Sequence, residues 1–182
     1  MKLVVLDRDG VINFDSADYI KNVSEWIPIP GSIEAIAALS QAGFEVVIAT
    51  NQAGLARGLF GVDELECMHD KLRGLVEARQ GRVGAIFYCP HGPEDGCDCR
   101  KPGTGLLDAI EREYGCSLSG CCFIGDSMKD VLAARRKGCR PVLVRTGNGS
   151  ATEAQLDVDG DCDVAVFDDL AAAARALVNG FW

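Results

Sequence analysis

The sequence of 182 residues contains no long apolar run and fewer basic than acidic side chains. No stretch approaches the roughly 20 apolar residues that a membrane-spanning helix needs. The 18 basic and 27 acidic residues give a formal net charge of −9, which argues against non-specific binding to nucleic acid or to an anionic membrane surface. The first apolar run, at residues 3–6, is too short and too soon followed by charged residues to be a signal peptide. We therefore expect a cytoplasmic protein with no nucleic-acid or membrane partner.

Histidine is scarce, with two residues, whereas cysteine is frequent, with nine. An odd number of cysteines in a reducing compartment argues against a disulfide framework and favours metal ligation and buried thiols. No Cys-His or Ser-His pair is placed for nucleophilic catalysis. A catalytic nucleophile in this chain is therefore expected to be a carboxylate.

Composition and the order of segments favour one α/β domain over residues 1–182. Apolar residues make up 48% and charged residues 25%, which is ordinary for a soluble globular protein. Short buried strands are predicted at 3–6, 44–49, 85–88, 121–124, 141–144 and 163–166, and helices at 32–42, 63–79, 106–114, 128–137 and 170–178. This alternation predicts a three-layer sandwich with a mainly parallel, Rossmann-like sheet between the helices.

The connecting segments carry further expectations. Residues 11–26 form a polar and aromatic loop of the right length to cover a site, and residues 147–150 read as a loose turn. The stretch from Gly54 to Gly58 is interpreted as a glycine-bounded loop. Asp63, with Glu66 three residues later, is expected to form a capping box for the second helix.

Two carboxylates, Asp7 and Asp9, come directly after the first buried strand, and Gly10 lets the backbone turn sharply beside them. In open α/β sheets the carboxyl ends of the strands open into the crevice where ligands bind. On its own, such an Asp-x-Asp-Gly stretch is more often a turn or a cap. Its interpretation as a site therefore depends on the residues at the carboxyl ends of the other strands.

Polar residues also occupy the ends of three of the other predicted strands: Thr50, then the pair Arg100 and Lys101, then Asp126 with Asp130 four residues on. Carboxylates from separate strands can share one divalent cation, and Mg²⁺ prefers one or two carboxylates, water and substrate phosphate. A hydroxyl and a cationic side chain can hold phosphoryl oxygens, and phosphoryl transfer needs little beyond such positioning and charge neutralisation. The strand ends together predict a Mg²⁺-dependent site for phosphoryl transfer, with an aspartate as nucleophile.

A second cluster predicts a structural zinc site in the loop before Lys101. Three thiols and an imidazole make a complete tetrahedral set with no open position, at Cys89, His91, Cys97 and Cys99. The spacing is tight enough for one loop to wrap one ion. Zinc bound there would fix a loop without secondary structure and so orient Arg100 and Lys101. The remaining cysteines are expected to be inert: Cys67, Cys116, Cys121, Cys122, Cys139 and Cys162.

Four stretches resemble, in order, the four motifs of the haloacid dehalogenase-like phosphatases: Asp7 to Gly10, Thr50 to Gln52, Lys101-Pro102, and Gly125 to Asp130. The resemblance spans almost the whole chain. It implies that Asp7 attacks phosphorus and forms an aspartyl-phosphate. It also implies that Asp9 protonates the leaving alkoxide and then takes a proton from the hydrolytic water.

The same resemblance implies roles for the remaining motif residues. Thr50 and Lys101 would hold the phosphoryl oxygens, and Mg²⁺ would be bound by Asp7, the main-chain carbonyl of Asp9, and Asp126. Asp130 would lie outside the metal's own ligands and orient either a metal-bound water or Lys101. No large cap domain is inserted after the first or second motif, so loops and the zinc segment are expected to define the pocket.

Two zinc-bearing subfamilies of these phosphatases share this layout. One hydrolyses D-glycero-D-manno-heptose 1,7-bisphosphate at the 7-position, in the synthesis of nucleotide-activated heptose for lipopolysaccharide core, and the other hydrolyses histidinol phosphate. The stretch from Thr50 to Gly58, with Arg57, resembles the heptose group, and Arg100 points the same way. The residues expected to contact the substrate are Asp15, Asp18, Tyr19, Asn51, Gln52, Arg57, Arg100 and Ser127.

The expected partner is a small sugar bisphosphate, and we expect a monomer. Arg57 and Arg100 are positive charges that the hydrolysed phosphate does not need, so a second phosphate on the substrate would use them. The ammonium group of histidinol phosphate would be repelled by the same arginines. Histidinol-phosphate phosphatase remains the alternative, together with a catalytically idle relative that only binds a sugar phosphate.

Overall fold

The computed structural model describes residues 2–159 and 163–180, and its six strands form one parallel sheet. The strands lie in the order β3-β2-β1-β4-β5-β6. Their bounds are β1 Lys2–Leu6, β2 Phe44–Asn51, β3 Ile86–Cys89, β4 Cys122–Gly125, β5 Arg140–Val144 and β6 Ala165–Phe167. The predicted parallel, Rossmann-like sheet is confirmed.

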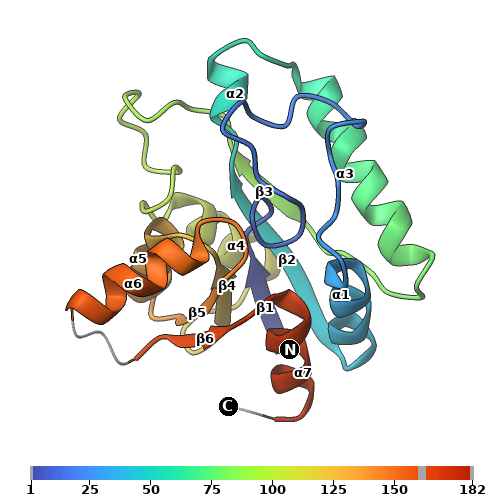
Figure 1. The fold of residues 1–182 in the computed structure, drawn as a ribbon, viewed down its shortest axis with the longest axis vertical. Coiled ribbons are helices and arrows are strands. Elements are labelled where there is room, and N and C mark those ends of the chain that lie inside the picture. The colour runs from blue at the N-terminus through green and yellow to red at the C-terminus, as the bar shows by residue number, and fades with distance from the viewer. Residues whose placement is uncertain (1, 160–162, 181–182) are drawn as a thin grey trace.

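Helices cover both faces of this sheet and complete the three-layer sandwich. The described helices are α1 Ser32–Gln41, α2 Ala53–Ala56, α3 Val62–Glu77, α4 Gly105–Tyr114, α5 Met128–Lys137, α6 Gly149–Asp159 and α7 Leu170–Val178, of which the short α2 lies beyond the end of β2. Figure 1 shows α1, α3 and α7 on one side of the sheet, and α4, α5 and α6 on the other. Within the described residues, no helix is long and apolar enough to cross a membrane.

β1 is the central strand and is buried on both faces. Alternate residues of a strand point to opposite faces. Val4 and Leu6 accordingly belong to the core beneath α1, α3 and α7, while Leu3 and Val5 belong to the core beneath α4 and α5. This double burial explains why the strand reads as a continuous apolar run.

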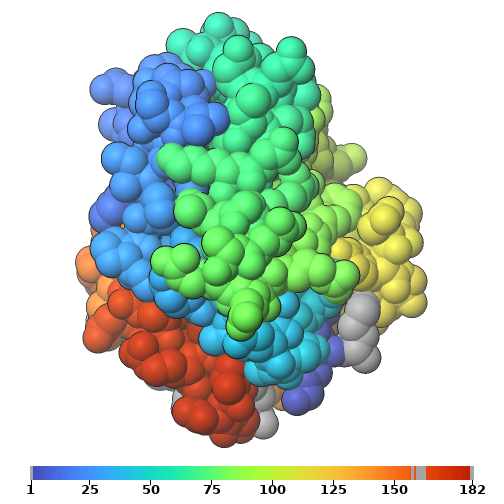
Figure 2. Space-filling model, turned by 90° about the vertical axis from the view of Figure 1, so that its right-hand side faces the viewer, coloured from blue at the N-terminus to red at the C-terminus, as the bar shows by residue number. Residues whose placement is uncertain are grey.

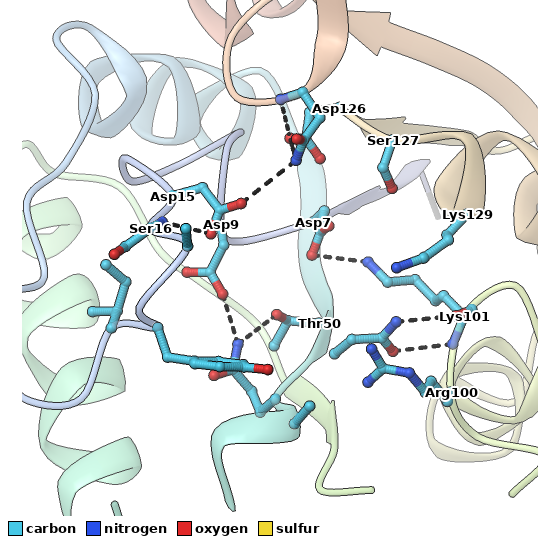
Figure 3. A pocket seen from close by; sticks show the side chains of 17 residues that line it. Asp7, Asp9, Asp15, Ser16, Thr50, Arg100, Lys101, Asp126, Ser127 and Lys129 are labelled. Carbon is cyan, nitrogen blue, oxygen red and sulfur yellow. Dashed lines mark hydrogen bonds and ion pairs between the residues drawn. The ribbon is translucent and has the colours of Figure 1, made fainter. Parts of the chain in front are cut away.

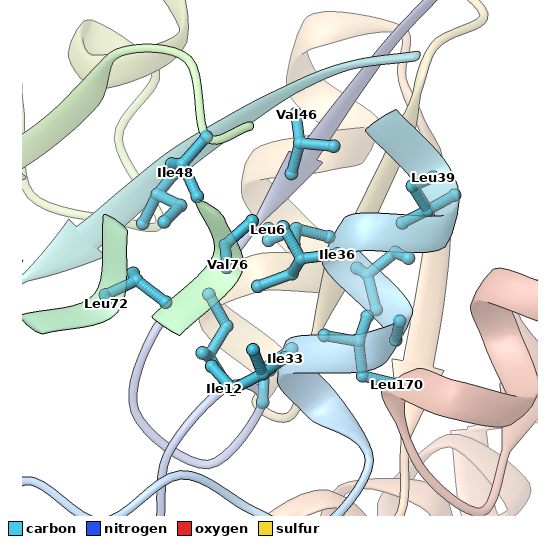
Figure 4. Packing of buried hydrophobic residues seen from close by; sticks show 14 of the residues in the cluster. Leu6, Ile12, Ile33, Ile36, Leu39, Val46, Ile48, Leu72, Val76 and Leu170 are labelled. Atoms are coloured by element: carbon cyan, nitrogen blue, oxygen red, sulfur yellow. The ribbon is translucent and has the colours of Figure 1, made fainter. Parts of the chain in front are cut away.

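The larger core lies between the sheet and the layer of α1, α3 and α7. Figure 4 shows Leu6 and Ile48 of the sheet facing Ile36 of α1 and Val76 of α3. All four side chains are fully buried. Burying a side chain of this size contributes roughly 1.5–3 kcal/mol, so this layer holds the sheet rigid behind the site.

The order of the strands reverses at β1, since the chain adds β2 and β3 on one side of it and then β4, β5 and β6 on the other. Ligands of open α/β sheets bind at the carboxyl ends of the strands beside such a switch point. Asp7 directly follows β1, and Asp126 directly follows β4. The fold therefore places these two carboxylates where a ligand is expected.

The segment between β1 and α1 folds back along α3 (Figure 2). Nζ of Lys71 on α3 donates to the carbonyl oxygens of Val23, at 2.9 Å, and Trp26, at 2.7 Å. The Trp26 side chain is fully buried. The predicted covering loop over residues 11–26 is thus anchored at its far end, so its near end is held over the site.

Two local expectations about the third helix and the segment before it were wrong. Gly54 to Gly58 is not a simple loop, because Ala53–Ala56 form the short helix α2. The capping partner of α3 is not Asp63 with Glu66. Instead, Oε2 of Glu64 accepts a hydrogen bond from the backbone N–H of Gly61 at 2.8 Å, because the helix already begins at Val62.

α6 is a helix where the sequence predicts only a loose turn at its start. Its apolar pattern is weak, and tertiary contacts hold it instead. Leu156 packs with Val131 and Leu143. The hydroxyl of Thr152 donates to the main-chain oxygen of Asp126 at 3.0 Å, which ties the helix to the end of β4.

Candidate active site

A pocket of about 290 Å³ opens at the carboxyl ends of the strands (Figure 3). Its lining comes from the ends of β1, β2 and β4, the covering loop, the segment before α4, the starts of α2 and α5, and the turn after β5. Its lining consists of Asp7, Asp9, Asp15, Ser16, Ala17, Tyr19, Ile20, Thr50, Asn51, Gln52, Ala53, Arg100, Lys101, Asp126, Ser127, Lys129 and Asn148. The polar residues at the ends of three separate strands therefore meet in one cavity.

Lys101 is the cation at the centre of the site. Its Nζ lies 2.8 Å from Oδ1 of Asp7 and 2.6 Å from Oδ1 of Asp130, and it donates to the carbonyl oxygen of Ala49 at 2.8 Å. The side chain is only 2% exposed. Burial alone would lower the pKa of Lys101, but the carboxylates of Asp130 and Asp7 raise it, so the ammonium stays charged.

Asn51 fixes the backbone of this lysine. Its Oδ1 accepts from the N–H of Lys101 at 3.0 Å, and its Nδ2 donates to the Lys101 carbonyl oxygen at 3.1 Å. Both polar groups of the amide are therefore engaged. Asn51 lines the pocket as expected of a substrate contact, but its hydrogen bonds position Lys101.

Asp9 is held by three side chains. Nε and Nη2 of Arg8 donate to its two oxygens at 3.1 Å each, and Nδ2 of Asn13 donates to Oδ1 at 2.8 Å. Nε2 of Gln52 donates both to Oδ2 of Asp9 and to Oγ1 of Thr50, at 2.8 Å in each case. Gln52 thus fixes the spacing between the carboxylate and the hydroxyl.

Asp126 is held against a turn of the backbone. Its Oδ2 accepts from the main-chain N–H of Asn148 at 2.8 Å and from Nδ2 of the same residue at 3.2 Å. A Cβ atom at Gly10 or at Gly147 would lie 2.2 Å from that oxygen, and both residues have positive φ, at +80° and +58°. Only glycine fits at these two positions beside the carboxylate.

Three buried carboxylates converge here without enough positive charge to neutralise them. Ligand oxygens of Asp7, Asp126 and Asp130 lie within 4.8 Å of one another. Burial, followed by the nearby charge of Asp130, raises the pKa of Asp7 well above its usual range despite the opposing effect of Lys101. Burial likewise raises the pKa of Asp126 to about 6. A hard divalent cation would relieve this repulsion, so the donor set fits Mg²⁺.

Asp130 also caps the start of α5. Its Oδ2 accepts from the backbone N–H of Ser127 at 3.1 Å and from the Ser127 hydroxyl at 2.6 Å. Its other oxygen pairs with Lys101. Asp130 therefore links the helix cap to the lysine, and the hydroxyl of Ser127, expected to contact substrate, is already engaged.

The four predicted zinc ligands lie together in the loop after β3. Sγ of Cys99 lies 3.2 Å from Sγ of Cys89 and 3.5 Å from Sγ of Cys97, and Nδ1 of His91 lies 3.2 Å from Sγ of Cys99. All four ligand atoms lie within 4.8 Å of one another. The edge of a zinc–thiolate tetrahedron is about 3.8 Å, so the set is compatible with one zinc ion.

The protonation of these thiols is uneven. Burial and the neighbouring Cys99 raise the pKa of Cys89 to about 12. For Cys97, burial acts to raise the pKa, but hydrogen bonds with the Arg100 N–H, Cys99 and Cys89 lower it to about 7. Nη1 of Arg100 donates to the carbonyl oxygen of His91 at 3.1 Å, which connects the cluster to the pocket.

The remaining described cysteines do not join this cluster. Cys67 is exposed, and burial raises the pKa of both Cys122 and Cys139 to about 12, which suits unreactive thiols. Cys162 lies outside the described residues.

The other expected substrate contacts divide into two groups. Asp15, Tyr19 and Arg100 line the pocket, and burial raises the pKa of Asp15. Asp18 and Arg57 are exposed and do not line it. The guanidinium of Arg57 lies over the ring of Tyr19, 5.4 Å from its centroid, so Arg57 reaches the site only through that ring.

Sequence reasoning missed several residues of the site, among them Arg8, Asn148 and Lys129. Arg8 is 1% exposed and holds Asp9, although its position between two aspartates was available as a signal. Asn148, which contacts Asp126, lies in a turn that carries no motif. Lys129 is exposed and lines the pocket, but within the motif it reads as an ordinary surface position of a helix.

The sheet, the four strand-end motifs and the buried carboxylate cluster are those of a haloacid dehalogenase-like hydrolase. The family described as HAD-hydrolase-like matches residues 98–173. The chain is 58% identical over 177 residues to a D-glycero-beta-D-manno-heptose-1,7-bisphosphate 7-phosphatase of Pseudomonas aeruginosa, covering 97% of this chain and 98% of that protein. A protein of the same name from Pseudomonas putida is 54% identical over 178 residues, which cover 98% of this chain and all of that protein, 100%.

Solved structures agree with this relationship. A D,D-heptose 1,7-bisphosphate phosphatase from B. bronchiseptica, complexed with magnesium and phosphate, has a TM-score of 0.93 at 50% identity, covering 98% of this chain and 99% of that one. The enzyme from Burkholderia thailandensis has a TM-score of 0.74 at 39% identity, with 98% and 99% covered. The chain therefore belongs to the D-glycero-D-manno-heptose 1,7-bisphosphate 7-phosphatase family of the haloacid dehalogenase-like hydrolases.

Proposed function

We propose that this chain is a Mg²⁺-dependent phosphatase that hydrolyses the 7-phosphate of D-glycero-D-manno-heptose 1,7-bisphosphate, towards nucleotide-activated heptose for lipopolysaccharide core. The observation that carries the proposal is the meeting of Asp7, Lys101 and Asp126 at the switch point, in a chain 58% identical to such an enzyme. We propose in addition that it acts as a single domain and as a monomer.

Asp7 is the proposed nucleophile. Its Oδ1 is held by Lys101 Nζ at 2.8 Å and accepts from the backbone N–H of Arg8 at 2.7 Å. With one oxygen fixed in this way, Oδ2 is the atom that attacks phosphorus and forms an aspartyl-phosphate. The bond between phosphorus and the sugar oxygen breaks, and the alkoxide leaves.

Asp9 is the proposed acid and base. It gives a proton to the leaving alkoxide, and it later takes one from the water that attacks phosphorus. That attack breaks the bond between phosphorus and the Asp7 oxygen, which releases inorganic phosphate and restores the Asp7 carboxylate. The support for this role is its contact with Gln52, which also holds Thr50. Because the Thr50 oxygen accepts from Gln52, its own O–H is free to donate to a phosphoryl oxygen while Lys101 neutralises another.

Asp7, the main-chain carbonyl of Asp9, and Asp126 are the groups that would hold Mg²⁺. When bound, the cation neutralises the phosphate and lets that dianion approach the Asp7 carboxylate. Asp130 would act indirectly, by holding Lys101 in place.

Cys89, His91, Cys97 and Cys99 would hold a structural zinc ion. Zinc would stabilise the loop and, through the hydrogen bond between Arg100 and His91, fix the direction of the Arg100 guanidinium. We assign the second phosphate of the substrate to Arg100, which lines the pocket. Arg57 is assigned to holding Tyr19 over the site.

Phosphate release from two substrates tests this function. Purified protein with Mg²⁺ should hydrolyse the heptose 1,7-bisphosphate with a higher kcat/KM than histidinol phosphate. Asp7→Asn keeps the size of the side chain but removes the attacking charge, and it should abolish turnover of the bisphosphate. Faster hydrolysis of histidinol phosphate would move the assignment to that activity, and no hydrolysis of either would indicate a binding protein.

A further inference from the structure

A second hollow of about 240 Å³ adjoins the active-site pocket on the side of the loop that carries the four proposed zinc ligands, residues 89–99, here called the zinc loop. Three residues line both cavities: Arg100, Lys101 and Lys129. The remaining lining of the second hollow comes from the zinc loop and the proline of the lysine motif, namely Gly92, Pro93, Gly96, Cys97 and Pro102. The two cavities therefore border each other at three cationic side chains.

These three cations differ in what they already bind. Lys101 is buried and is paired with Asp7 and Asp130, so its charge belongs to the reacting phosphate. Arg100 uses Nη1 on the His91 carbonyl oxygen, which leaves the other N–H donors of its fork. The Lys129 side chain forms no ion pair and no hydrogen bond with the described part of the chain, although several acidic side chains line the pocket.

The positions of these side chains suit one anion outside the reaction centre. Figure 3 shows Arg100 and Lys129 on the same side of the pocket, across from Asp15 and Ser16. Lys129 is exposed and Arg100 half-buried. An unpaired ammonium beside a guanidinium, at the border between two cavities, is a favourable place for a phosphate group.

We propose that Lys129 is a further specificity-determining residue, which binds the second, non-reacting phosphate of the bisphosphate together with Arg100, at the mouth of the hollow beside the zinc loop. This inference rests on the proposed function, and it adds Lys129 as a residue that determines specificity. The sugar then spans from Asp7 towards the zinc loop. Its second phosphate is held by Arg100, which directly follows the zinc loop, and by Lys129, which lies on α5.

Kinetics on two matched substrates test the subsite: the heptose 1,7-bisphosphate and the same heptose carrying only the 7-phosphate. Lys129→Met keeps the aliphatic length and removes the charge. It should lower kcat/KM for the bisphosphate about tenfold, the scale of one charge-assisted contact, mainly through KM. The loss for the monophosphate should be several times smaller. Lys129→Arg should restore the preference for the bisphosphate.

Lys2→Met is the matched control. It also removes one lysine charge, but at the amino end of β1, whereas the site lies at the carboxyl end, so kcat/KM should stay unchanged for both substrates. Equal losses on both substrates would place Lys129 against the reacting phosphate and overturn the proposal. If Lys129→Met left kcat/KM for the bisphosphate unchanged, the role of Lys129 would also be overturned, but the proposed function of the protein would stand. Absence of bisphosphate turnover by the wild type would overturn both.

Discussion

Replacement of Lys101 by methionine probes the charge balance of the site in one step. The substitution keeps most of the buried volume, but it removes an ammonium that contacts Asp7 at 2.8 Å, Asp130 at 2.6 Å and the Ala49 carbonyl at 2.8 Å. Removing one partner of a buried ion pair costs about 3–5 kcal/mol, because the other charge is left buried and unpaired. We expect a loss of this size in the free energy of unfolding of magnesium-free protein at about pH 8.

The loss should shrink as the pH falls. Without Lys101, the folded-state pKa of Asp7 rises further above its unfolded value near 3.9. The folded protein then binds protons that the unfolded chain does not, so its stability increases as the pH falls from about 8 towards 5. Urea denaturation at several pH values measures this directly. Activity with Mg²⁺ should fall on the order of a hundredfold to a thousandfold, since a preorganised charge on the phosphoryl group is lost.

Lys137→Met is the matched control. Nζ of Lys137 also bridges two carboxylates, at 2.5 Å from Asp108 and 2.7 Å from Glu111, but the side chain is 18% exposed, against 2% for Lys101. Ion pairs near the surface contribute at most about 1 kcal/mol. The hydrogen bond with Lys137 lowers the pKa of both carboxyls, so the loss in this variant should stay constant from about pH 8 to 5. This reasoning would be refuted if the two variants lost the same free energy of unfolding and if that loss depended on pH in the same way.

The two proposed metal sites give three other predictions. Elemental analysis should find about one zinc per chain, and Cys97→Ser should lower zinc content and activity together, whereas Cys67→Ser, outside the cluster, should change neither. Because the folded-state pKa of Asp126 is about 6, above its unfolded value, magnesium-free protein should gain stability as the pH falls from about 7 to 5. Mg²⁺ competes with that proton, so its effect on Tm should be larger at about pH 8 than at pH 5, and equal shifts would argue against Asp126 as a ligand.

The sequence carries enough information to place the main elements of the site. β1 is buried on both faces, so its apolar run is visible, and the charged residues directly after it must lie at the edge of the sheet. The same reasoning places Thr50 and Asp126. Parallel strands bring their carboxyl ends to one edge, so residues distant in sequence are predicted to meet without knowledge of the loops.

Contacts between distant segments decide the features that the sequence does not reveal. Arg8 is buried with its partner Gln52, which directly follows the neighbouring strand β2, and no local pattern marks that pairing. Asn148 reaches Asp126 through a turn that is shaped by the close approach of Gly10. α6 has little apolar periodicity of its own and is a helix because Leu156 and neighbouring residues pack on the strands.

Arg57 is another residue whose contacts cannot be predicted from the sequence. Its position in the stretch after β2 suggests a contact with substrate, but the loop carries its guanidinium over the ring of Tyr19. Charge alone does not say whether an arginine faces a ligand or a neighbouring side chain. Only the course of two loops, at residues 11–26 and 57–61, decides that question.

The position of the bond that is cleaved tests the central claim most directly. Phosphorus NMR of the heptose 1,7-bisphosphate, incubated with the protein and Mg²⁺, distinguishes the primary 7-phosphate from the 1-phosphate at the anomeric carbon. Our account predicts that the 7-phosphate resonance disappears and inorganic phosphate appears, while the 1-phosphate resonance persists, and that Asp7→Asn leaves the spectrum unchanged. Loss of the 1-phosphate, or hydrolysis that survives in Asp7→Asn, would contradict it.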